Sequence, residues 1–181
     1  GHTEISDAVT RPVVAGALLG RASKSGLLRK SDIRPGDRIL LTKRPGIEGT
    51  AIIAAEFPET LAARGVGRAV IEAAATFDAR IPILAEARLA VDSGRAVALH
   101  DVTEGGVATA LAELAQAAGV GFDIDLDVLE PYPETAAICD ALGLDPLGLI
   151  GSGSLIIAAR DGDAAAVLDT LAEADIEVRE V

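Results

Sequence analysis

Residues 96–106 read AVALHDVTEGG, in which an apolar run, Ala96–Leu99, leads into two ionisable residues and then two adjacent glycines. From Val107 onward, apolar residues recur at the three- and four-residue spacing of one helix face. The stretch therefore predicts a strand over Ala96–Leu99, a tight corner, and an amphipathic helix from Val107 to Ala118. Two roles fit the corner itself.

The first role is anion binding. Gly105 and Gly106 allow backbone amides to approach a ligand closely, and the N-terminus of the following helix carries a partial positive charge. Thr103 could bind a phosphate oxygen. His100 and Asp101 could transfer protons or bind a polar substrate, which makes them the candidate catalytic residues.

The second role is purely structural. In an ordinary tight turn, Thr103 caps the helix and Glu104 complements the helix dipole in the first turn. The glycines then only provide the backbone geometry. The residues of the corner alone leave both roles open.

A second corner of the same kind lies in LTKRPGIEGTAI, residues 41–52. The predicted strand Arg38–Thr42 runs into a loop with Gly46 and Gly49, and Thr50 opens a predicted helix. It is not a P-loop, because no Lys-Ser/Thr pair follows the second glycine. Thr42 and Thr50 are candidate phosphate contacts. The alternative is a shaped connection in which Thr50 is simply the helix N-cap.

Two further groups of polar residues have a simpler alternative. His2 and Glu4 of the opening GHTE could bind a metal or a substrate, although a histidine at a chain end is also typical of a solvated position. Asp123, Asp125 and Asp127 alternate with apolar residues and share one face of a predicted strand. We expect a solvated strand face there, and no metal site in this chain.

Composition narrows the class of protein. The net charge is −12, from 28 acidic and 16 basic residues without a basic cluster, which argues against a nucleic-acid binder. The single cysteine, Cys139, excludes an internal disulfide and fits a reducing, cytoplasmic setting. No apolar run has membrane-spanning length, so we expect no membrane partner.

The order of predicted elements favours a layered fold. Strands are expected at 11–20, 38–42, 96–99, 122–128, 154–159 and from 176, and helices at 51–63 with a break at Pro58, 66–77, 82–91, 107–118, 134–142 and 163–174. Helices cluster early and alternate with strands late. This order predicts an α/β (α+β) fold, a three-layer α/β/α sandwich with a mixed sheet.

Four stretches carry a family resemblance: GHTE at 1–4, LTKRPGIEGTAI at 41–52, HDVTEGG at 100–106 and, more weakly, GSGSLIIA at 151–158. Together they resemble the C-terminal domain of the aminoimidazole ribonucleotide (AIR) synthase superfamily, in its AIR synthase-related and hydrogenase expression/formation branch. The resemblance implies that residues 1–10 are the remnant of an interdomain hinge. Residues 11–181 are then the C-terminal domain, and the N-terminal domain is absent from this sequence.

The resemblance also implies a site. Members of the superfamily bind ATP and Mg²⁺ in a cleft between the two domains, with the acidic Mg²⁺ ligands mainly in the N-terminal one. By that likeness three groups of residues line the cleft here: His2, Thr3 and Glu4; Thr42, Gly46, Glu48, Gly49 and Thr50; and His100, Asp101, Thr103, Gly105 and Gly106.

The implied reaction is phosphoryl activation of an oxygen on a small-molecule substrate or a partner protein, by an enzyme that dimerises through its N-terminal domain. This chain by itself is expected to be inactive. The hydrogenase expression/formation protein also carries a cysteine at its extreme C-terminus, whereas this chain ends in Val181 with Cys139 in mid-chain. That departure leaves the carbamoyl dehydratase reaction unassigned. The alternative function is a non-catalytic nucleotide-binding or regulatory domain.

Overall fold

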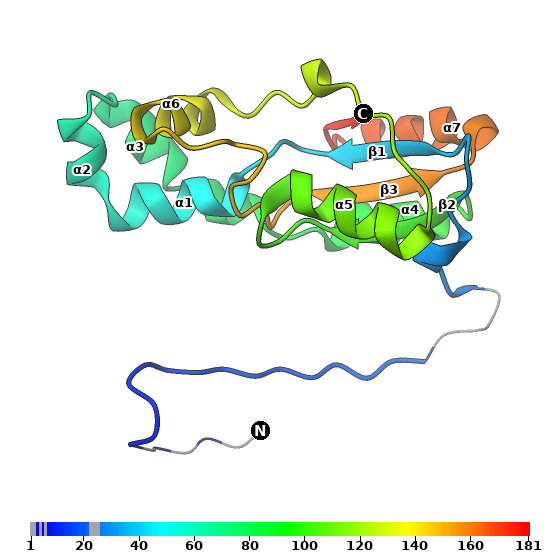
Figure 1. The fold of residues 1–181 in the computed structure, drawn as a ribbon, viewed down its shortest axis with the longest axis horizontal. Coiled ribbons are helices and arrows are strands. Elements are labelled where there is room, and N and C mark those ends of the chain that lie inside the picture. Colours follow the sequence, from blue (N-terminus) through cyan, green and yellow to red (C-terminus); the bar gives the residue numbers. More distant parts are fainter. Residues whose placement is uncertain (1–2, 4, 6, 22–25) are drawn as a thin grey trace.

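The computed structural model describes residues 3, 5, 7–21 and 26–181 and contains a four-stranded sheet (Figure 1). Its strands are β1 (Arg38–Thr42), β2 (Ala96–Asp101), β3 (Leu155–Ala159) and β4 (Val178–Glu180), in the order β2-β3-β1-β4. All three pairings are antiparallel, so the expectation of a mixed sheet is wrong. The reason is that β1 and β2, which run in the same direction and could have paired as parallel strands, are separated by the antiparallel β3.

The α-helices match the predicted ones with shifted ends, whereas the short 3-10 helices were not predicted. The helices are η2 (Lys30–Asp32), α1 (Ile47–Glu56), α2 (Pro58–Ala63), α3 (Arg68–Ala74), η3 (Phe77–Arg80), α4 (Leu84–Asp92), α5 (Gly106–Ala118), η4 (Leu126–Val128), α6 (Pro133–Leu142) and α7 (Asp161–Ala172). The break at Pro58 is confirmed, because α1 ends at Glu56 and Pro58 occupies the first turn of α2, where its missing N–H costs nothing.

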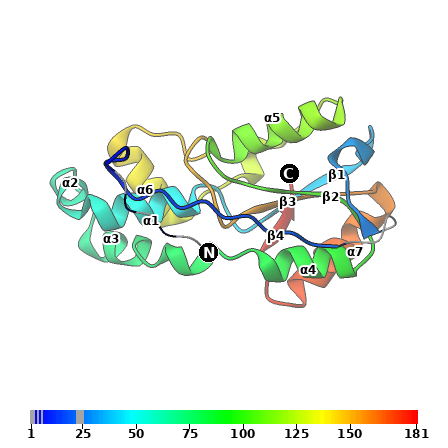
Figure 2. The same ribbon diagram turned by 90° about the horizontal axis from the view of Figure 1, so that it is seen from below.

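Alternation along β1 shows how the sheet is covered on both faces. Ile39 and Leu41 pack in one cluster with Val107 and Leu114 of α5. Leu40 points to the other face and packs with residues of α4 and α7. Figure 2 shows α5 on one side of the sheet and α4 and α7 on the other. The predicted three-layer α/β/α arrangement is therefore confirmed.

A second group of helices adjoins one end of the sheet. Helices α1, α2, α3 and α6 share a cluster of buried side chains that includes Leu61, Ile71 and Ile138 (Figure 1). Helix α1 leaves the sheet directly after β1 and packs its far end into this group. The start of α1 is thus fixed between the sheet and the helical group, which determines where the first glycine corner lies.

Two predicted strands are absent. The described part of 11–20 is extended but unpaired, with Val13 76% and Leu18 98% exposed, and it runs apart from the rest of the chain (Figure 1). A strand needs a hydrogen-bonded neighbour, and this segment has none among the described residues. Over 122–128 the chain is irregular and then forms η4, because the Asp125 carboxylate accepts the backbone N–H of Asp127 and closes a local turn.

None of the helices in the described part of the chain combines the length and the apolar character needed to cross a bilayer.

Candidate functional site

The two glycine corners lie at the same end of the sheet. Strands β1 and β2 run in the same direction on either side of β3, so both chains leave the sheet where β3 begins. Hydrogen bonds join the three segments there: the N–H of Val102 donates to the carbonyl of Ser154 at 3.1 Å, and the N–H of Leu155 donates to Oγ1 of Thr42 at 3.0 Å. The convergence of the predicted cleft segments is thus a feature of the sheet topology.

The connection between α6 and β3 passes between the two corners. The N–H of Gly49 in α1 donates to the carbonyl of Ile150 at 2.9 Å. From the other side, the N–H of Ala108 in α5 donates to the carbonyl of Leu147 at 3.0 Å, and the N–H of Gly151 donates to the carbonyl of Thr103 at 3.1 Å. We call residues 145–154 the clasped segment. First-turn amides of both helices are therefore bonded to protein backbone.

The glycines make this close approach possible. A Cβ on Gly106, whose φ is +65°, would stand 2.6 Å from the carbonyl oxygen of Leu149 and nearer still to that of Leu147. A Cβ on Gly49 would stand 2.7 Å from Cδ1 of Leu149. Both glycines are buried, so their role in the described structure is to admit the clasped segment.

The hydroxyl groups of Thr42 and Thr50 form hydrogen bonds within the protein. Thr42 and Thr50 are fully buried. The hydroxyl of Thr50 donates to the carbonyl of Gly46 at 2.6 Å and lies 2.8 Å from the hydroxyl of Thr135. Neither Thr50 nor Thr103 is an N-cap, because Gly46 and Gly105, both in the left-handed conformation, occupy those positions. The capping alternative is therefore wrong in detail, although both corners do have a structural role.

The side chain of His100 is buried and faces α5. Its Nε2 lies 3.0 Å from Oε2 of Glu113, and its Nδ1 lies 2.9 Å from Nζ of Lys30. An ammonium can only donate, so Nδ1 accepts from Lys30 and Nε2 carries the proton that it donates to Glu113. Only 8% of the His100 surface is exposed. Its two hydrogen bonds connect the end of β2 to α5 and to η2, next to the second corner.

The groups that do reach the surface at the second corner are carboxylates. Asp101 and Glu104 are exposed, Thr103 is half-buried, and Glu48 is half-buried at the first corner. In the described residues no group of three or more His, Cys, Asp or Glu side chains could hold a metal ion. Bare carboxylates repel phosphate, so these residues by themselves do not form an anion site.

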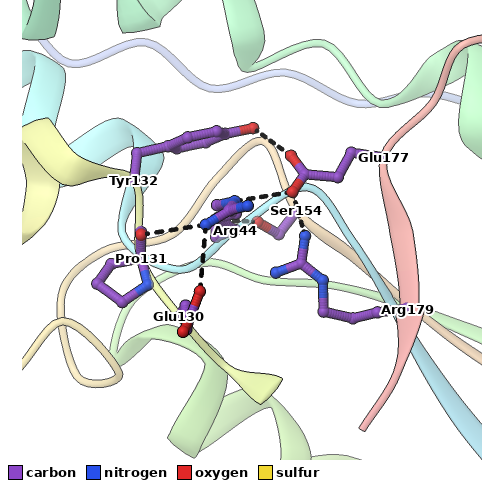
Figure 3. A network of polar contacts seen from close by, with 7 residues as sticks. All are labelled: Arg44, Glu130, Pro131, Tyr132, Ser154, Glu177 and Arg179. Carbon is purple, nitrogen blue, oxygen red and sulfur yellow. Dashed lines mark hydrogen bonds and ion pairs between the residues drawn. The ribbon is translucent and has the colours of Figure 1, made fainter. Parts of the chain in front are cut away.

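A polar network beside the first corner could not be foreseen from the sequence (Figure 3). The guanidinium of Arg44 donates to Glu177 at 2.7 Å, and the Tyr132 hydroxyl donates to the same carboxylate at 3.1 Å. Arg179 also pairs with Glu177. Ser154 ties this network to the clasped segment, because its hydroxyl donates to the carbonyl of Arg44 at 2.8 Å. The members come from four separate segments, so no local pattern connects them.

The network shifts the ionisation of two of its members. Burial raises the pKa of Tyr132, the charge of Glu177 adds to this shift, and Arg80 opposes it. Burial would also raise the pKa of Glu177, but the hydrogen bond from Arg44 and the charge of Arg179 prevail and lower the pKa below its ordinary value. Glu177 is therefore held as the carboxylate.

The remaining predicted residues are peripheral or buried. His2 and Glu4 lie outside the described residues, and Thr3 is exposed in the N-terminal segment. Cys139 is buried in α6, and burial raises the pKa of its thiol to about 11. A buried, protonated thiol is unreactive, in line with the filler role that its position on a helix suggests.

Known proteins resemble this chain over most of its length. The sequence profile described as "AIR synthase related protein, C-terminal domain" matches residues 34–181. The putative hydrogenase expression/formation protein MJ0676 of Methanocaldococcus jannaschii is 30% identical over 179 residues, which is 96% of this chain and 49% of that protein. The carbamoyl dehydratase HypE of Cupriavidus necator is 39% identical over 140 residues, covering 76% of this chain and 37% of that protein.

Solved structures agree with the fold. The crystal structure of Escherichia coli HypE matches with a TM-score of 0.70 at 25% identity, over 84% of this chain and 45% of that one. A HypE crystallised in complex with ATP matches with a TM-score of 0.61 at 27% identity, over 81% of this chain and 41% of that one. The chain thus spans less than half the length of each of these relatives.

Proposed function

Because the chain belongs to the AIR synthase-related family through its C-terminal domain, we propose that it forms one wall of a Mg-ATP and substrate cleft in an ATP-dependent enzyme. The observation that carries the proposal is the meeting of both glycine corners and the clasped segment at one end of the sheet. Ligand sites of layered α/β folds commonly lie at such an end, where several loops converge.

The reaction proposed for the assembled cleft is phosphoryl activation of a substrate oxygen. Asp101 is the exposed acid–base group of this wall, and the buried His100 beside it is held by Lys30 and Glu113. ATP supplies the phosphoryl group, and Mg²⁺ neutralises its charge when bound mainly by residues of another domain. Binding of ATP by a HypE relative supports the nucleotide part of this proposal.

The proposed substrate is defined only by its chemical class. A small molecule or a partner protein would present the oxygen that is activated, and the assembled enzyme is proposed to be a homodimer. A solved HypE–HypF complex shares the fold, with a TM-score of 0.64 at 22% identity. That complex shows that a HypE can engage a partner protein.

The second candidate is a non-catalytic nucleotide-binding or regulatory domain. It is favoured by the use of the corners as scaffold, since the Gly49 and Ala108 amides and the Thr42 and Thr50 hydroxyls all bond to protein. A wall that only holds a partner domain needs no exposed acid–base residue, so Asp101 separates the two candidates.

Two measurements test the cleft. Calorimetric titration of the 181-residue chain with Mg-ATP is expected to give weak or no binding, and submicromolar affinity would refute a site shared between domains. In a chimera that joins this chain to the other half of E. coli HypE, Asp101→Asn is expected to lower ATP turnover about 100-fold. Asp92→Asn, on the exposed end of α4, is the matched control. Equal turnover in both variants would favour the non-catalytic candidate.

A further inference from the structure

Beside the Arg44–Glu177 network lies Arg80, a cation that pairs with no carboxylate of the described residues. Arg80 ends η3, and its carbonyl oxygen accepts Nζ of Lys43 at 2.8 Å. The same oxygen lies 3.0 Å from where a Cβ on Gly153 would stand, so Arg80 adjoins the clasped segment. This places Arg80 at the end of the sheet where the two glycine corners meet.

The Arg80 guanidinium rests on two aromatic rings. Its Cζ lies 4.6 Å from the centroid of Phe77 and 4.4 Å from that of Tyr132. The two rings meet edge to face at 5.3 Å and 73°. The whole chain has one tyrosine, three phenylalanines and no tryptophan, so half of its aromatic residues form this platform. Stacking at these distances restricts the guanidinium, whose five in-plane N–H donors exceed what its contact with the Tyr132 hydroxyl can use.

The platform itself is held rigidly. Phe77 is 1% exposed. The Tyr132 hydroxyl is anchored on Glu177, which Arg44 and Arg179 hold from other sides (Figure 3). Arg44 also lies 5.4 Å from the Tyr132 centroid. Because the ring cannot swing, Arg80 is ordered before any ligand arrives, which lowers the entropy cost of binding.

The charge of Arg80 distinguishes it from its neighbours. Arg44 pairs with Glu177 and Glu130, Arg179 pairs with Glu177, and Lys43 pairs with Glu86. Arg80 is exposed, and no carboxylate of the described residues lies within ion-pair distance of it. In a chain of net charge −12, a stacked guanidinium that has no carboxylate partner among the described residues is suited to bind an anion at the converging loops.

We propose that Arg80, seated on the Phe77–Tyr132 platform, binds a phosphate group of the ligand that enters this end of the sheet. This inference rests on the proposed function, because Arg80 would provide a cationic contact for phosphate in a cleft wall whose exposed side chains include the carboxylates Asp101 and Glu104. Planar N–H pairs on a guanidinium match two phosphate oxygens. Arg44 and Glu177 act as positioning residues, because they touch Tyr132 and not the phosphate.

The test follows the arginine side-chain N–H resonances of the ¹⁵N-labelled 181-residue chain during titration with pyrophosphate. A saturable shift of the Arg80 resonance is expected. Arg80→Gln should weaken binding about tenfold or more, the loss of one charge-assisted contact. The affinities of Arg80→Lys and Phe77→Leu should lie between those of the wild type and Arg80→Gln. The first variant keeps the charge but loses the planar guanidinium, and the second loses one of the two rings on which the guanidinium stacks. Arg68→Gln, at an exposed position 88% accessible, is the matched control and should bind like the wild type.

Three results would overturn the assignment: no saturable Arg80 shift, equal affinity in Arg80→Gln and wild type, or malonate binding as tightly as pyrophosphate. Titrations with ATP and with glucose 6-phosphate identify which ligand carries the phosphate. Tighter binding of ATP indicates a phosphate of the nucleotide, and tighter binding of the sugar phosphate indicates a phosphorylated substrate. An inactive HypE chimera with a positive titration refutes the proposed function alone. An active chimera indifferent to Arg80→Gln refutes the Arg80 assignment alone.

Discussion

The corner after β1 and the corner after β2 share a pattern of glycines at the start of a helix, yet their charged side chains behave in opposite ways. At the first corner Lys43 is bonded to three carbonyls and to Glu86, whose side chain is only 4% exposed. At the second corner Asp101 and Glu104 are exposed. One corner is held by a buried ion pair, whereas the other presents its charge at the surface. A shared backbone pattern therefore does not imply a shared role.

The largest expected effect comes from breaking the buried ion pair of the first corner. Lys43→Met keeps the chain length but leaves Glu86 buried without its partner, which lies 2.6 Å away, and removes the donor from three carbonyls. We expect a loss of about 3–5 kcal/mol in the free energy of unfolding, measured by urea denaturation. Arg68→Met, which breaks an exposed pair with Glu72, is the control and should cost about 0.5 kcal/mol or less. Similar losses in the two variants would contradict the role of the buried ion pair in holding the first corner.

The second corner is best tested through its backbone. Gly106→Ala adds a Cβ that clashes with the carbonyls of Leu147 and Leu149 at a positive φ, so we expect a loss of about 2–4 kcal/mol in thermal or urea unfolding. Gly119 has a similar φ of +70° but open space around it. Gly119→Ala should therefore cost only about 1 kcal/mol. Equal losses would show that φ, and not contact with the clasped segment, sets the cost.

The smallest effect concerns the pH dependence of the network beside the first corner. The pKa of Glu177 is lowered in the folded state, chiefly by the hydrogen bond from Arg44 and the charge of Arg179 against the opposing effect of burial. Glu177 therefore stabilises the fold above its ordinary pKa of 4.5, and this contribution is lost as the pH falls through the lower folded value. In Glu177→Gln, unfolding followed from pH 6 to pH 3 should show a shallower fall in stability than in the wild type. A wild-type slope in that variant would contradict the pairing.

Local pattern predicted the elements and the corners, because periodicity and glycine placement are properties of neighbouring residues. The helix from Gly106 and the break at Pro58 were expected for this reason. The order β2-β3-β1-β4 was not, since strand direction depends on which strands become neighbours. The segment 11–20 has the composition of a strand but lacks a neighbour among the described residues.

The two glycine corners were predicted at the right places in the chain, but their contacts were not predicted. The sequence located both corners, yet it did not show that Gly49 and Gly106 admit the clasped segment. Nor did it show that His100 is held between Lys30 and Glu113, or that Arg80 stacks on Tyr132. Each of these contacts joins residues that are distant along the chain or is decided by packing. A single sequence carries no local signal for such pairs.

The clasped segment has a consequence for the dynamics of this end of the molecule. Its carbonyls accept from α1 on one side and from α5 on the other, while its Gly151 N–H donates to the second corner. Neither helix start can separate from the sheet without releasing a hydrogen bond to the same short stretch of backbone. We therefore expect the two corners to open as one cooperative unit, so that the amide hydrogens of Gly49, Ala108 and Gly151 exchange with solvent through a common opening event.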